Sequence, residues 1–80
     1  MSISILYFAA TRDAVGKVGE ELELGAESLS VQELGQLLLE RHPGLTLAGV
    51  RFAINEEFAS SDQRVVPGDT VAVIPPVSGG

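Results

Sequence analysis

The sequence predicts an α+β fold in which one main helix packs across one face of a mixed β-sheet of about four to five strands, followed by a flexible C-terminal tail. Three observations predict it. Stretches of alternating polarity stand in both halves of the chain, a single well-capped amphipathic segment lies between them, and 45% hydrophobic content over 80 residues suits one folded domain. We expect this domain to span residues 1–76 and an extended tail to span residues 77–80.

The N-terminal part of the chain predicts two strands joined by a short turn. Residues 3–8 alternate with the period of a strand and are rich in β-branched and aromatic side chains. Thr11 can cap a turn over residues 12–15, and Gly16 would close this turn in a left-handed conformation. Leucine and glutamate alternate over residues 21–24, which is typical of a strand with one face in solvent.

The helix gives the strongest local signal in the chain. Ser30 and Glu33 stand at the spacing of a capping box, and Leu29 and Leu34 stand at the spacing of the hydrophobic staple around it. The apolar face continues from Leu34 with the period of a helix, until His42, Pro43 and Gly44 end it.

The C-terminal half predicts two further strands. Residues 50–55 alternate and are followed by a polar turn at residues 56–57. Residues 67–69, Pro-Gly-Asp, form a second turn signal. Residues 71–74 are apolar on both faces, as a central strand should be, and residues 75–76 end it because proline cannot donate to a ladder.

Composition excludes several classes of function. The net charge of −6 argues against nucleic acid and anionic membranes as partners and favours a partner with a basic face. The absence of cysteine removes disulfides, thiolate metal sites and nucleophilic thiols. No apolar run approaches the roughly 20 residues that span a bilayer, and the first residues lack the basic flank of a signal peptide. We therefore expect a cytoplasmic protein.

The final residues are the clearest indication of function. Gly79 and Gly80 lose much backbone entropy on ordering and bury no side chain, so they do not serve stability. They instead give a thin chain whose terminal carboxylate can enter a narrow channel. Fully extended from Pro76, such a tail reaches roughly 16 Å. We expect Gly80 to present its carboxylate as a reactive group.

A docking surface is expected beside this tail. One helix can cover only one face of the sheet, and the opposite face should carry apolar side chains close to where the tail leaves. These are Leu6, Phe8, Phe58 and Ile74. Phe8 and Phe58 could instead pack in the core, with the phase of each strand deciding.

Over essentially its whole length, the chain resembles the MoaD-like small sulfur-carrier subunits of molybdopterin synthase, which are ubiquitin-like β-grasp proteins of the MoaD/ThiS superfamily. The resemblance rests on the first strand and turn, the capped helix, the Pro-Gly-Asp turn and the chain end. The matching segments are Leu6 to Arg12, Val15-Gly16, Pro67-Gly68-Asp69 and Ile74-Pro75-Pro76-Val77-Ser78-Gly79-Gly80. The chain end is the most specific of them.

The resemblance implies a carrier rather than an enzyme in its own right. An ATP-dependent enzyme would adenylate the Gly80 carboxylate, and a sulfur donor protein would convert it to a thiocarboxylate. The tail would then enter the large catalytic subunit of molybdopterin synthase and give its sulfur to the dithiolene of molybdopterin. The chain itself would carry no catalytic residue, bind no metal and hold no cofactor, with ATP belonging to the activating enzyme.

The resemblance also implies which residues touch the large subunit. By position these are Phe8, Arg12, Phe58 and Ile74, with Pro75 and Pro76 leading into the tail of Val77, Ser78 and Gly79. Ile74 stands where relatives can have an aromatic residue. Arg12 could equally be a solvated surface charge, and His42 is interpreted as a helix-end residue without a second metal ligand.

Three other functions fit parts of this pattern. A sulfur carrier for thiazole synthesis in thiamine formation shares the reactive end, although such relatives usually lack the two prolines before it. A ubiquitin-like modifier would join Gly80 to lysines of other proteins. A plain interaction module would have an inert tail.

Overall fold

The computed structural model describes residues 1–76, and the predicted tail of Val77, Ser78, Gly79 and Gly80 lies outside the described residues. Seven strands and two helices follow one another along the described chain. They are β1 (Ser2–Tyr7), α1 (Ala9–Val15), β2 (Gly19–Glu23), β3 (Leu29–Ser30), α2 (Val31–Arg41), β4 (Arg51–Ile54), β5 (Glu57–Ala59), β6 (Arg64–Val65) and β7 (Thr70–Ile74). Within residues 1–76 neither helix is long and apolar enough to cross a membrane.

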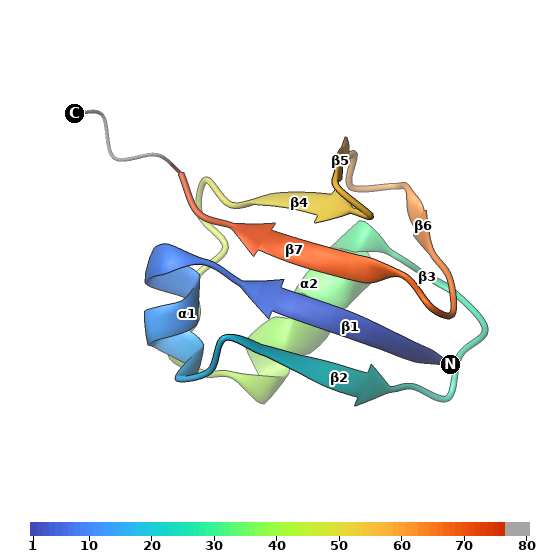
Figure 1. Ribbon diagram of the computed structural model, residues 1–80, viewed down its shortest axis with the longest axis horizontal. Coiled ribbons are helices and arrows are strands. Elements are labelled where there is room, and N and C mark those ends of the chain that lie inside the picture. Colours follow the sequence, from blue (N-terminus) through green and yellow to red (C-terminus); the bar gives the residue numbers. More distant parts are fainter. Residues whose placement is uncertain (77–80) are drawn as a thin grey trace.

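The main sheet has five strands in the order β2-β1-β7-β4-β5. β1 and β7 run parallel, and the other neighbouring pairs run antiparallel, so the sheet is mixed as predicted. Figure 1 shows α2 crossing one face of this sheet, while α1 lies at the end toward which β1 and β7 both point. The central position of β7 explains why both of its faces are apolar.

The core lies between α2 and the covered face of the sheet. The side chains that fill it are no more than 2% exposed, and they are Ile3, Ile5, Tyr7, Leu22, Leu34, Leu38, Val65, Val71 and Val73. The predicted capping box of α2 is confirmed. The Glu33 N–H donates to Ser30 Oγ at 3.0 Å, and the Ser30 N–H donates to Glu33 Oε1 at 2.8 Å.

Two local predictions were wrong. Thr11 is not the N-cap of α1, because Phe8 holds the extended backbone of that position (φ −126°, ψ 143°) and Thr11 lies three residues further on. The polar turn consists of Asn55 and Glu56, both with positive φ (49° and 74°), and Glu57 already belongs to β5. A hairpin with two positive φ values matches the twist of its strands, which fixes the register of β5.

A partly buried polar cluster joins β1, β2 and the C-terminal end of α2. The Tyr7 hydroxyl donates to Glu20 Oε2 at 2.5 Å, and His42 Nε2 lies 2.7 Å from the same oxygen. The rings of Tyr7 and His42 meet edge to face at 5.8 Å. Burial raises the pKa of Glu20, but the hydrogen bonds from Tyr7 and His42 outweigh burial and hold that pKa below its ordinary value. Burial, followed by the hydrogen bond to Glu20, raises the pKa of Tyr7.

We expect the hydrogen bonds of Glu20 in this cluster to make the fold less stable in acid. The pKa of Glu20 is lower in the folded chain than its ordinary value of 4.5. Its contribution to the free energy of unfolding is therefore complete above pH 4.5 and is lost as the pH falls through the folded pKa. In urea unfolding, Glu20→Gln should therefore lose less stability than the wild type between about pH 5 and pH 3. Glu40→Gln, which changes an exposed carboxylate of α2, is the control. Equal acid dependence of the two variants would contradict this role of Glu20.

Candidate functional site

The face of the sheet opposite α2 carries a row of apolar side chains. The strand register pairs Leu6 with Ala72, Ala72 with Ala53, and Ala53 with Phe58, so these four residues cross the sheet side by side. Leu6 and Phe58 remain 39% and 57% exposed at the two sides of the row, and Phe8 next to Leu6 is 46% exposed. We call Leu6, Phe8, Ala53, Phe58 and Ala72 the open face.

The open face is concave. Small alanines occupy its middle while larger side chains stand at its sides, which leaves a hollow of about 470 Å³ bordered by Leu6, Phe8 and the Asn55–Glu56 turn. Phe8 borders this hollow, and Phe58 is the register partner of Ala53, which lines it. Exposed aromatic side chains on an apolar face are typical of protein-binding surfaces rather than of a monomer's ordinary exterior. Because both rings are largely exposed, the alternative that Phe8 and Phe58 pack in the core is wrong. Which protein binds them stays a prediction.

The remaining predicted contact residues lie at the end of the sheet where β7 finishes. Ile74 is half-buried and is the register partner of Arg51, Pro75 is half-buried, and Pro76 is exposed. Arg12 is exposed on α1, at the same end of the sheet. The predicted residues thus gather along one face and one end of the domain. The predicted reactive residue, Gly80, lies outside the described residues.

Sequence reasoning gave Thr11 a different role and missed Gly49, and both residues fix this end of the sheet. Thr11 is only 3% exposed, and its hydroxyl oxygen lies 2.7 Å from the Phe8 carbonyl and 3.0 Å from the Val73 carbonyl, so it links α1 to β7. Gly49 has a φ of +73°, and a Cβ there would lie 3.1 Å from Pro76 Cγ. The loop before β4 therefore packs directly against the residue that leads into the tail.

This contact makes Gly49→Ala informative. The left-handed backbone alone should cost about 1–2 kcal/mol of unfolding free energy, and the contact with Pro76 should add to it. Gly16→Ala is the matched control, because Gly16 has a φ of +86° but a Cβ added there would meet no atom within 4 Å. Denaturant unfolding should show the larger loss for Gly49→Ala, and equal losses would contradict the packing of Gly49 against Pro76.

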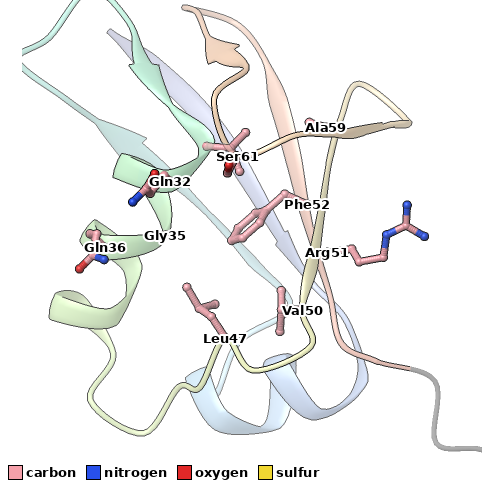
Figure 2. A pocket seen from close by; sticks show the side chains of 10 residues that line it. Gln32, Gly35, Gln36, Leu47, Val50, Arg51, Phe52, Ala59 and Ser61 are labelled. Atoms are coloured by element: carbon pink, nitrogen blue, oxygen red, sulfur yellow. The ribbon is translucent and has the colours of Figure 1, made fainter.

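Arg51 is another residue that the sequence did not single out. Its guanidinium carbon lies 3.6 Å from the centre of the Phe58 ring, a cation–π contact on the open face. The alternation in β4 sends its neighbour Phe52 to the other side. Figure 2 shows the Phe52 ring directed toward α2 while Arg51 points away from it.

Phe52 belongs to a second hollow, of about 330 Å³, between α2 and β4. Leu47, Val50 and Phe52 give it an apolar floor, and Gln32 and Gln36 border it (Figure 2). Gly35 allows this close approach, since a Cβ there would lie 3.0 Å from Leu47. None of the residues predicted from sequence to contact a partner lines this hollow. Within residues 1–76 no three His, Asp or Glu side chains gather to hold a metal ion.

A five-stranded mixed sheet grasping one long helix, with an exposed apolar face beside the end of its central strand, defines a ubiquitin-like β-grasp protein. Comparison with solved structures agrees. SAMP1 from Haloferax volcanii aligns over 100% of both chains with a TM-score of 0.86 at 23% identity. One chain of the complex of subunits 1 and 2 of molybdopterin-converting factor from Helicobacter pylori aligns over 100% of both chains, with a TM-score of 0.69 at 22% identity.

The sequence comparison is more specific. The ThiS family model matches residues 5–80, and the chain belongs to this family. It is 40% identical to the human molybdopterin synthase sulfur carrier subunit, over 98% of this chain and 93% of that protein. It is 34% identical to the protein of the same name from Chlamydomonas reinhardtii, over 100% of both chains.

Proposed function

We propose that this chain is the sulfur-carrier subunit of a molybdopterin synthase. One observation carries the proposal: the exposed apolar face lies beside the end of β7, from which Pro75 and Pro76 lead into the Val-Ser-Gly-Gly end. A partner that binds this face is placed to receive the final residues. The full-length similarity to two molybdopterin synthase sulfur carrier subunits supports the same function.

In the proposed reaction the Gly80 carboxylate is first activated. An ATP-dependent enzyme transfers AMP to a carboxylate oxygen with loss of pyrophosphate, because a free carboxylate is a poor electrophile. Sulfur supplied by a donor protein at the oxidation level of sulfide then attacks the acyl carbon, forms the carbon–sulfur bond and releases AMP. The sulfur of the resulting thiocarboxylate bonds to a pterin precursor in the large subunit, and water then cleaves the bond between the acyl carbon and the sulfur, which restores the carboxylate. The catalytic residues of the transfer belong to the large subunit.

The described residues support the positioning of the tail in this reaction. Thr11 ties α1 to β7, Gly49 packs against Pro76, and the core holds β7 between β1 and β4. These contacts fix the position of the end of β7 relative to the open face, and orientation of the reacting group is worth many orders of magnitude in rate. The Helicobacter pylori neighbour is a complex with a second subunit, which favours a large-subunit partner here.

A growth experiment separates this function from its alternatives. In a strain that lacks the gene, the activity of molybdenum-dependent enzymes should be lost, while growth without thiamine should be retained. The wild-type gene should restore the activity of the molybdenum-dependent enzymes. A thiamine requirement without loss of those enzymes would show a thiazole carrier instead. Conjugates to other proteins that depend on Gly80, with both pathways intact, would show a modifier. A cytoplasmic location stays a prediction.

A further inference from the structure

Arg51 is held at the surface in an unusual way for a charged side chain. Its guanidinium stacks on Phe58 at 3.6 Å, and Phe58 is itself 57% exposed. Stacking on an aromatic face restrains the guanidinium while leaving its in-plane N–H groups free to donate. These donors form a fork that matches a carboxylate with two parallel hydrogen bonds.

Arg51 has no carboxylate partner among residues 1–76. Lys17 pairs with Glu20 at 3.6 Å and Arg64 pairs with Glu33 at 3.5 Å, whereas no Asp or Glu oxygen of the described chain lies within 4.0 Å of Arg51. Arg12 and Arg41 also have no Asp or Glu oxygen within 4.0 Å among residues 1–76, but of these three arginines Arg51 is the one whose guanidinium stacks on an exposed aromatic ring.

The charges on this side of the sheet are unevenly placed. The register sets Glu21 opposite Ser4 and Glu23 opposite Ser2, which places both exposed glutamates on the same side of the sheet as Leu6, at the β2 edge. β4 lies three strand spacings from β2, about 14 Å. Salt screens most of an interaction over that distance. The β2 edge therefore carries Glu21 and Glu23, and the latter lies 3.7 Å from the N-terminal ammonium group. Glu56 borders the hollow at the turn that follows β4, and the opposite end of β4, next to Ile74, carries Arg51.

We infer that Arg51, stacked on Phe58, binds an aspartate or glutamate side chain of the large subunit. The ion pair fixes the orientation in which the partner receives the final residues, since the reversed orientation would set the partner's carboxylate against Glu21 and Glu23. This inference rests on the proposed function, and it names a chemical feature of the partner: an acidic side chain at the rim of an apolar patch.

Binding measurements with the full-length chain and the large subunit from the same genome test the inference. Arg51→Gln should weaken binding about tenfold and reduce the loss of affinity on adding salt, because one charge pair is gone. The affinity of Arg51→Lys should fall between those of the wild type and Arg51→Gln, because lysine keeps the charge but loses the two parallel donors of the guanidinium. Arg64→Gln, which removes the same charge from β6, should bind like the wild type.

A double-mutant cycle tests the stacking. Phe58→Leu keeps an apolar side chain but removes the ring, so Arg51→Gln should cost less in this background than in the wild type. Additive effects of the two substitutions would contradict a role for the stack.

Three outcomes would overturn the inference. Unchanged affinity and salt dependence of Arg51→Gln, in a chain that still transfers sulfur, would remove Arg51 from the interface and leave the proposed function standing. An effect of Arg51→Gln that disappears once Gly79 and Gly80 are deleted would show that Arg51 binds the chain's own carboxylate. Failure of the wild-type chain to bind the large subunit would reject the proposed function together with the inference.

Discussion

Deletion of Gly80 is expected to reduce sulfur transfer to the level seen without the protein, while the melting temperature stays unchanged. The deletion moves the terminal carboxylate back by one residue, about 3.3–3.6 Å. A misplacement of only about 1 Å can cost roughly a hundredfold in rate, so a full residue should abolish the reaction. Stability should not change, because a terminal glycine has no side chain to bury.

Sulfur transfer from the reconstituted system to the pterin precursor measures this effect. Appending one glycine is the matched control, since it keeps a Gly-Gly end but moves the carboxylate outward by the same step. It should be equally inactive. A shortened chain that still forms the dithiolene would show that Gly80 does not carry the sulfur.

Phe58→Asp is expected to weaken binding to the large subunit by about a hundredfold or more. Aromatic residues that anchor an interface commonly contribute about 2 kcal/mol or more to binding. The new carboxylate would also be desolvated in the complex and would compete with the large subunit for Arg51, which stacks on this position. The free chain should tolerate the change, because Phe58 is 57% exposed and outside the core.

Isothermal titration calorimetry with the large subunit, alongside thermal unfolding of the free chain, separates the two effects. Val18→Asp is the control, since Val18 is 67% exposed and does not belong to the open face. It should bind like the wild type. Equal affinities of Phe58→Asp and the wild type would exclude the open face as the docking surface.

The main elements of the fold could be predicted because their signals are local. The capping box of Ser30 and Glu33 fixed the start of α2, and apolar residues on both faces marked β7 as a central strand. β3 and β6 escaped prediction because each has two residues, too few for an alternating pattern, and they pair across more than 30 residues of chain. The cluster of Tyr7, Glu20 and His42 escaped for a similar reason, since its members meet only in the tertiary structure.

The candidate site divides in the same way. An open face with Phe8 on or beside it could be expected because one helix covers only one side of a sheet, although core packing of Phe8 stayed an alternative until the phase of β1 was known. The phase of Phe58 could not be settled from sequence, since it depends on the positive φ values of Asn55 and Glu56. The stacking of Arg51 on Phe58 and the packing of Gly49 against Pro76 depend in turn on strand register and loop path, which no local pattern reveals.

The most direct test of the central claim is the intact mass of the chain after incubation with the activating enzyme, ATP and a sulfur donor. The proposed function predicts a mass change equal to the exchange of one oxygen for one sulfur, located at Gly80 by fragmentation. An unchanged mass while the enzyme consumes ATP, or sulfur attached anywhere else in the chain, would contradict it.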